Sequence, residues 1–165
     1  MSVLNQALRA ALDTRQPLLA ELHAQGTDCY RLFHGSQEGA PGLTADRYGP
    51  QLLVQSFHQS LERDALLDLH ATIEQHLGQS LFLVYNDRSR GNSRVDRHDT
   101  VYQASDDALV DMVGHEWGLN YRVRGRHAGQ DPLLFLDLRN ARGWVKRNSA
   151  GKSVLNLFAY TCGVG

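Results

Sequence analysis

The sequence predicts an α+β protein whose central unit is a mixed β-sheet with one helix packed on a face. Short alternating or apolar segments typical of strands recur at residues 29–35, 51–57 and 80–86. An amphipathic helical pattern lies between the second and third of these segments, at residues 60–77. A last apolar run, residues 154–158, has the character of a strand buried on both faces of a parallel sheet. We therefore expect the start of a doubly wound domain after the α+β unit.

Composition indicates a soluble, globular chain of 165 residues, with 42% hydrophobic and 21% charged residues. The sequence has no membrane-length apolar run and no export signal, which predicts a cytoplasmic protein. Cys29 and Cys162 match no disulfide or metal-binding spacing, and the eight histidines are scattered, so we expect no metal site. The net charge of −1 excludes a strongly basic nucleic-acid binder but leaves a local basic patch open.

The first segment, residues 1–27, is expected to be helical. Leu4, Leu8 and Leu12 share one face at helical spacing, and Gly26 is a suitable stop. Pro17 is expected to divide the segment into two short helices, because proline lacks the N–H of a continuing helix.

The second segment, residues 28–125, is the expected central α+β domain. Residues 36–49 are rich in turn residues, and Gly49-Pro50 predicts a tight hairpin into the strand at 51–57. Ser60 is expected to cap the helix that ends at Gly78. Residues 87–99 predict an arginine-rich loop, with an edge strand left open. Two strands around residues 115–118 predict a hairpin.

The third segment, residues 126–165, is the expected beginning of the doubly wound domain. A helix is predicted from about Asp137 to Asn148, followed by a turn at 149–152 and the apolar strand 154–158. A strand followed by a glycine-bearing loop is how such folds hold a cofactor. By spacing alone the pattern is weak, because neither a G-x-G-x-x-G nor a P-loop ending is present, and an ordinary strand and turn stays open.

Three stretches in the same order carry a resemblance to a known family: EGAPGLTADRYGPQLLVQ (38–55), GQDPLLFLDLRNAR (129–142) and VLNLFAYTCGVG (154–165). YNDRSRGNSR (85–94) is a looser match. Together they resemble class I S-adenosylmethionine-dependent methyltransferases, and within them the ribosomal RNA large-subunit group that modifies a cytosine.

The resemblance implies a Rossmann-like fold, S-adenosylmethionine as the methyl donor, and transfer of its methyl group to RNA, a ribosomal RNA base above all. Carried over by position, the donor-binding residues would be Phe135, Asp137, Arg139, Arg142, Asn156, Phe158, Tyr160, Thr161, Cys162 and Gly163, with Cys162 contributing its backbone. These residue types suit a sulfonium cation that bears a carboxylate, because arginine pairs with carboxylates and aromatic faces attract cations. For Asp137 a first-turn acid, and for the two arginines a solvated helix face, stay open.

The chain also departs from the family pattern. Cys162 stands where the family has the first glycine of a pair, Val164 replaces an aromatic residue, and Asp131-Pro132 replaces a Lys-Thr pair. A helical segment takes the place of the family's N-terminal RNA-binding domain of PUA type. The target base is therefore left open, with a guanine base or a protein as other acceptors.

No catalytic residue is predicted within these 165 residues. A cytosine-5 methyltransferase needs a cysteine nucleophile, but Cys162 lies in the donor loop and Cys29 has the character of a small buried residue. In the family the nucleophile follows later. The chain is therefore expected to be an N-terminal fragment of a longer enzyme, inactive alone, that binds the donor weakly or not at all.

Arg88, Arg90 and Arg94 form a basic loop suited to the phosphates of RNA. A solvated loop neutralised by neighbouring aspartates is the other interpretation, and for Asp46 and Arg47 a structural ion pair or turn contact competes with a substrate role. The rival function is a non-catalytic α+β module that binds RNA or protein and keeps a remnant of the donor loop. The oligomeric state is open, including a dimer through an exposed strand edge.

Overall fold

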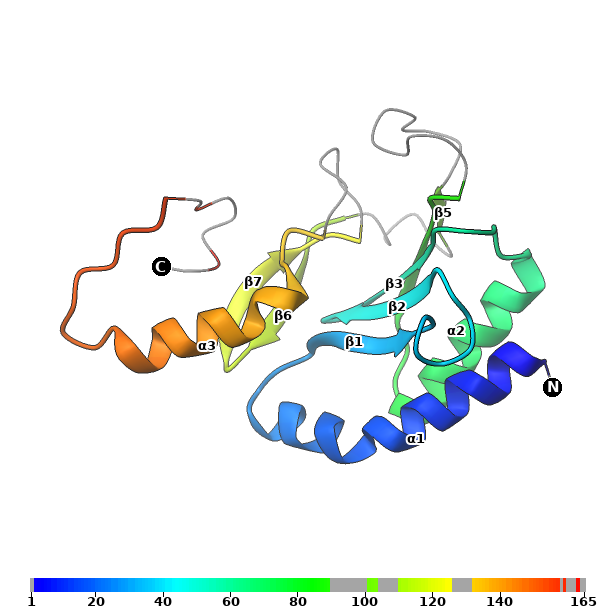
Figure 1. Cartoon of the computed structure of the whole chain (residues 1–165), viewed down its shortest axis with the longest axis horizontal. Coiled ribbons are helices and arrows are strands. Elements are labelled where there is room, and N and C mark those ends of the chain that lie inside the picture. The colour runs from blue at the N-terminus through cyan, green and yellow to red at the C-terminus, as the bar shows by residue number, and fades with distance from the viewer. Residues whose placement is uncertain are drawn as a thin grey trace.

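The computed structural model describes residues 2–89, 101–103, 110–125, 132–157, 159 and 163. In this part of the chain the main layer is a five-stranded sheet with the order β1-β2-β3-β4-β5 (Figure 1). Its strands are β1 (Cys29–His34), β2 (Leu43–Tyr48), β3 (Gln51–Ser56), β4 (Phe82–Asp87) and β5 (Val101–Gln103). The β3–β4 pair is parallel and the other neighbours are antiparallel. The predicted mixed sheet is therefore confirmed.

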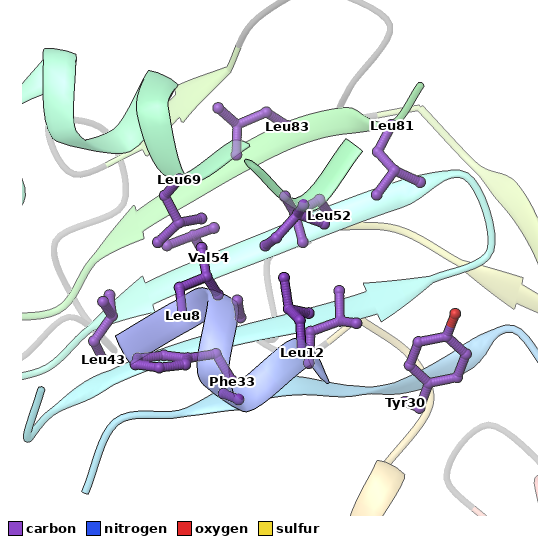
Figure 2. Packing of buried hydrophobic residues seen from close by; sticks show 14 of the residues in the cluster. Leu8, Leu12, Tyr30, Phe33, Leu43, Leu52, Val54, Leu69, Leu81 and Leu83 are labelled. Carbon is purple, nitrogen blue, oxygen red and sulfur yellow. The ribbon is translucent and has the colours of Figure 1, made fainter. Parts of the chain in front are cut away.

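One face of the sheet is covered by α1 (Val3–Ala24) and α2 (Arg63–Leu77), which lie side by side below it in Figure 1. Leu8 and Leu12 of α1 and Leu69 of α2 are fully buried against Leu52 and neighbouring sheet residues (Figure 2). The prediction of a single packed helix was wrong, because the N-terminal helix belongs to the same core.

The predicted break at Pro17 was also wrong, since α1 continues through it. Proline costs the helix one hydrogen bond, to the carbonyl four residues earlier. The buried face nevertheless continues from Leu12 to Leu19 and Leu22, so tertiary packing outweighs that loss. The end near Gly26 is confirmed: its φ of 65° is the left-handed conformation that favours glycine.

Strand β2 lies inside the stretch that its glycines and prolines marked as a turn. Its sequence, LTADRY, places an acid and a base side by side, and all six residues are buried. Asp46 pairs with Arg31 of β1, while Arg47 donates to the Gly49 carbonyl and the Tyr30 hydroxyl. These partners make charged residues compatible with a central strand. For Arg47, these contacts favour a structural role over a substrate role.

The predicted Ser60 cap was wrong. Helix α2 begins at Arg63 after Glu62, and Ser60 instead donates a hydrogen bond to the Asp87 carboxylate at the end of β4. The predicted end at Gly78 is confirmed by its left-handed φ of 67°.

The predicted hairpin is confirmed as β6 (Met112–Glu116) and β7 (Leu119–Val123). It packs on the face of the sheet opposite the two helices, where Val123 joins Cys29, Leu53 and Val84 in a second apolar cluster. Gly114 permits this approach, because a Cβ there would lie 2.5 Å from Cys29 Sγ.

The predicted helix near residue 137 begins as a 3₁₀ turn, η2 (Leu136–Leu138), and continues as α3 (Arg139–Asn148), and the predicted turn at 149–152 follows it. The predicted buried strand at 154–158 was wrong for its described residues. Val154, Leu155 and Leu157 are 49%, 82% and 76% exposed. A parallel strand takes its hydrogen bonds from neighbours on both sides, and among the described residues no strand pairs with this segment.

None of the described helices combines the length and the apolarity needed to span a membrane.

Candidate functional site

A pocket of about 590 Å³ lies beside the edge strand β1, between α1, the sheet face opposite the two helices, and residues 132–139. Its polar lining side chains are Arg31, Asp46, Gln55, Arg88, Asp137 and Arg139, and Phe135 adds an aromatic ring. Four of the predicted donor- and RNA-binding residues thus line one pocket: Arg88 of the arginine-rich loop, and Phe135, Asp137 and Arg139 from the entry into α3. The volume is within the range of small-molecule sites.

The sheet wall of the pocket is organised by an ion pair. Arg31 donates from Nε and Nη2 to the two carboxylate oxygens of Asp46, at 2.7 and 2.9 Å. The hydrogen bonds to Asp46 raise the pKa of Arg31, and Asp137 across the pocket adds to this effect. Burial raises the pKa of Asp46, although Arg31 opposes it. The pair fixes a planar guanidinium at the pocket wall, with the Arg31 side chain 43% exposed.

The facing wall is the segment that enters α3. Phe135 is 42% exposed, Asp137 is exposed, and Leu133 takes a left-handed φ of 72°. Arg139 lies over the ring of Trp117 at 4.8 Å and donates from Nη2 to Gln25 Oε1 at 2.8 Å. This cation–π contact orients Arg139 at the pocket rim.

Arg142 lies behind this wall in a buried ion pair with Glu116 of β6. Its Nε and Nη2 donate to the two carboxylate oxygens at 2.7 and 2.8 Å, and its Nη1 donates to the Phe135 carbonyl at 2.7 Å. Burial alone would lower the pKa of Arg142, but the hydrogen bonds to Glu116 raise it. Arg142 is only 5% exposed, so the open interpretation as a solvated helix face is wrong for it.

Glu116 was missed in the sequence. A usable pattern was present: in β6, Gly114 and Glu116 share one side of the strand, and Gly114 faces the sheet. An acid on an inward side needs a cationic partner. Glu116 is fully buried and also lies 3.8 Å from Arg139 Nε. Two guanidinium groups around one carboxylate leave one positive charge, and it lies toward the pocket on Arg139.

A second pocket, of about 370 Å³, lies on the other side of Arg142 and includes Tyr121, Lys146, Lys152 and Gly163. A Cβ at Gly163 would lie 3.7 Å from Arg142 Cδ and 3.9 Å from Tyr121 Cε1. The structure therefore divides the predicted donor-binding residues between two pockets, and Arg142 links them through its bond to the Phe135 carbonyl.

The remaining predicted site residues lie outside these pockets or outside the described residues. Asn156 is half-buried within the exposed segment after α3. Phe158, Tyr160, Thr161 and Cys162 of the predicted donor loop lie outside the described residues, as do Arg90 and Arg94 of the predicted RNA-binding loop.

Cys29 lines the first pocket but is a buried thiol whose pKa is raised to about 12, mainly by burial. Since the thiolate is the nucleophile, this environment disfavours nucleophilic chemistry. The described residues contain no group of three or more histidine, cysteine or acidic side chains able to hold a metal ion.

Comparison with known proteins places these features in a family. The family model of S-adenosylmethionine-dependent methyltransferases matches residues 30–165. A ribosomal RNA large subunit methyltransferase from Deinococcus radiodurans is 34% identical over 161 residues, which cover 94% of this chain and 38% of the relative. Ribosomal RNA large subunit methyltransferase I from Shigella flexneri is 32% identical over 145 residues, covering 84% and 34%. The chain thus spans little more than a third of the length of these relatives.

Solved structures agree with the sequence matches. A Streptococcus mutans protein assigned as a SAM-dependent methyltransferase superposes with a TM-score of 0.74 at 25% identity, over 99% of this chain and 41% of that one. The crystal structure of SMU.776, a protein assigned as a methyltransferase, in complex with SAH superposes with a TM-score of 0.75 at 25% identity. The match covers 99% of this chain and 40% of that one. The chain belongs to the S-adenosylmethionine-dependent methyltransferase family and is related to the ribosomal RNA large subunit methyltransferases.

Proposed function

We propose that the protein of which this chain forms part transfers a methyl group from S-adenosylmethionine to RNA, and that the acceptor is a base of ribosomal RNA. The observation that carries the proposal is the meeting of Phe135, Asp137 and Arg139 with Arg88 in one pocket, on a segment that matches the methyltransferase family. The names of the relatives support ribosomal RNA as the acceptor.

The residues of this pocket fit the donor in chemical kind. S-adenosylmethionine supplies a methyl group on a sulfonium cation, and also carries an ammonium, a carboxylate and ribose hydroxyls. Asp137 offers an exposed carboxylate, and the half-exposed ring of Phe135 suits a cation. Arg139 lies 3.8 Å from Glu116, whose two carboxylate oxygens already accept from Arg142, so its positive charge is only partly compensated. A carboxylate of the ligand would pair with it.

In this proposal the described residues bind and orient. Arg139 pairs with the donor carboxylate, Asp137 accepts from its ammonium or hydroxyl groups, and Phe135 packs beside it. Arg142 positions Phe135 through the carbonyl bond and lies beside Gly163 at the second pocket. Asn156, Phe158, Tyr160, Thr161 and Cys162 complete the donor site as predicted by the resemblance.

Arg88, Arg90 and Arg94 are proposed to face the RNA. Arg88 lies in the same pocket as Asp137, so RNA held there would be beside the donor. The proposal assigns the methyl acceptor to the sheet side of the pocket and the methyl donor to the side of residues 132–139.

The test is a titration with S-adenosylhomocysteine combined with methyl transfer to ribosomal RNA, using protein produced from the complete reading frame. Asp137→Asn and Arg139→Gln should each weaken binding by about tenfold, because each removes a charge-assisted hydrogen bond. Arg63→Gln, a charge loss on the exposed side of α2, is the matched control. Equal affinity for all variants would contradict the donor assignment.

A second candidate is an RNA- or protein-binding module without catalysis. The observation that favours it is that Arg142 is bound by Glu116 and Phe135 of its own chain rather than left for a ligand. Retained RNA binding together with absent donor binding and absent methyl transfer would select this alternative.

A further inference from the structure

The sheet face opposite α1 and α2 changes character along the strands. Toward one end it is apolar and covered by the β6–β7 hairpin and residues 132–136 through Tyr48, Leu53 and Val84. Toward the other end it carries a polar face that we define by five residues: Arg31, Thr44, Asp46, Gln55 and Arg88. In register, Arg31 lies opposite Asp46 and Thr44 lies opposite Gln55, so each pair points to the same side of the sheet.

Two guanidinium groups of this polar face are held in place. Arg31 is fixed by its two hydrogen bonds to Asp46, with its third nitrogen, Nη1, 3.3 Å from His34 Nδ1. Arg88 lies over the half-exposed ring of Phe57 at 5.1 Å, and its Nη1 donates to Gln55 Oε1 at 3.4 Å. Both lie in the wall of the first pocket. A fixed guanidinium plane stacks well on another planar group, because little conformational entropy is lost.

Hydrogen-bonding groups of the polar face are left over. Thr44 Oγ1 is buried, with the residue 7% exposed, and makes no hydrogen bond within the described residues. Gln55 lines the first pocket and accepts a hydrogen bond from Arg88 Nη1 through its amide oxygen. Its amide gives the pocket wall a hydrogen-bonding edge, so a ligand with donors and acceptors at its own edge would be favoured here.

The Arg31–Asp46 pair argues against a pure phosphate site on the β1–β2 side of the polar face. Arg31 is neutralised by the buried carboxylate of Asp46, which would itself repel a phosphate close by. A planar, neutral group with a hydrogen-bonding edge matches the guanidinium planes and the Gln55 amide better. A nucleobase has these properties, and unstacked RNA bases are bound on arginine planes and by polar edges.

We propose that the polar face is a nucleobase-binding subsite for single-stranded RNA, in which the base stacks on Arg88 and its edge meets Gln55. This rests on the proposed function, because the same pocket includes Phe135 and Asp137 of the proposed donor wall. The subsite would hold the acceptor nucleotide facing the methyl donor.

The experiment measures binding of a fluorescein-labelled single-stranded oligoribonucleotide of about 12 nucleotides by anisotropy, without donor, using protein from the complete reading frame. A matched oligonucleotide with abasic positions reports phosphate contacts alone. Arg88→Gln should weaken binding of the normal oligonucleotide by about tenfold, and Gln55→Leu should weaken it in the same direction. Each variant should reduce the affinity for the abasic oligonucleotide less than it reduces the affinity for the normal oligonucleotide. Arg63→Gln on the far side of the sheet should bind as the unaltered protein does.

Arg88→Lys separates stacking from charge. Lysine keeps the positive charge but lacks the plane, so we expect it to bind as weakly as Arg88→Gln. Four outcomes would each overturn the subsite. Arg88→Lys could bind RNA with full affinity, the abasic oligonucleotide could bind as tightly as the normal one, or the protein could bind no RNA. An acidic peptide that displaces the oligonucleotide, where a competing unlabelled RNA does not, is the fourth. S-adenosylhomocysteine titration of the same samples is independent of these results. Absence of donor binding by the unaltered protein, together with retained base-dependent RNA binding, would therefore refute the proposed function and leave the nucleobase subsite standing.

Discussion

The side chain that organises the candidate site is Arg142 of α3, because its guanidinium joins α3 to the hairpin and to the segment before the helix. It donates to the Glu116 carboxylate in β6 and to the Phe135 carbonyl in the pocket wall. Both charged groups are buried, so each depends on the other to offset its desolvation. In the proposed site, the pair positions Phe135 through the bond from Arg142 to its carbonyl.

Removal of one partner of this pair is predicted to be severely destabilising. Arg142→Met leaves the Glu116 carboxylate buried with a weaker partner at 3.8 Å, and should lower the free energy of unfolding by about 3–5 kcal/mol. The double variant Glu116→Leu/Arg142→Met removes both charges and should recover part of that loss. Urea denaturation measures all three proteins. A single variant as stable as the unaltered chain would show that the pair is not buried in solution.

The Cys29 thiol is predicted to be unreactive in the folded protein. Burial raises its pKa to about 12, so almost no thiolate exists at pH 8. In a Cys162→Ser background, iodoacetamide should modify Cys29 slowly under native conditions and rapidly in urea. Mass spectrometry follows the reaction. Rapid native modification would contradict the buried position and reopen Cys29 as a nucleophile.

Asp87 is predicted to make stability depend on acid. Burial would raise its pKa, but hydrogen bonds from Ser60, Ser89 and Ser56 outweigh this and lower it below 3.8. A lowered folded-state pKa means that the stabilisation is present above pH 3.8 and is lost as the pH falls through the folded value. Asp87→Asn should therefore lower the melting temperature at pH 7, with a difference that shrinks below about pH 3.8. Asp68→Asn, an exposed change on α2, is the control.

At the scale of elements, α1 packs on the sheet and shares its hydrophobic core with α2. Its buried stripe lies on the same core as β1 and β3 (Figure 2), and its N-terminal part lies beside α2 (Figure 1). A helix of this composition depends on such packing, because propensity alone leaves isolated helices marginal.

This role predicts a large difference between two equal truncations in α1. Leu8→Ala removes a fully buried side chain and should cost about 2–5 kcal/mol of unfolding free energy. Leu18→Ala removes a side chain that is 51% exposed and should cost less than about 1 kcal/mol. Equal costs, measured by urea denaturation, would show that α1 does not pack on the sheet.

At the scale of the whole molecule, two apolar clusters share the sheet between them. The larger cluster joins it to α1 and α2, and the smaller joins it to the hairpin and to Leu134. The Asp28 carboxylate adds a polar tie, accepting from the His115 amide at 2.6 Å. The sheet therefore connects α1 and α2 on one face with the hairpin and Leu134 on the other.

Shared clusters predict a single cooperative unfolding transition. Both tryptophans, Trp117 and Trp144, report on the hairpin and α3, whereas far-ultraviolet circular dichroism reports on all helices. The two signals should change at the same urea concentration. Separate midpoints would instead support independent units, such as the predicted division at residues 27 and 125, which stays a prediction.

Local sequence patterns predicted those elements whose formation depends on residues close together in the chain. The hairpin at Trp117-Gly118, the end of α2 at Gly78 and the buried strand β4 follow from turn chemistry and apolar runs, whereas the parallel pairing of β4 was not predicted. Local patterns failed for segments whose structure depends on a partner residue distant in the sequence. The segment LTADRY is a buried strand because Arg31 pairs with its Asp46 and Tyr30 accepts from its Arg47. Ser60 does not cap α2, because its hydroxyl donates to the Asp87 carboxylate instead.

The sequence by itself determined the family, the α+β class and most segments of this protein, since ordered motifs and periodicity are local properties of the chain. It also pointed to Phe135, Asp137, Arg139 and Arg88 one at a time. Only the tertiary structure decided that these four share a pocket, and that Arg142 is bound to Glu116. Pairing of buried charges and closure of a pocket depend on distances between segments far apart in the chain, and no local pattern contains those distances.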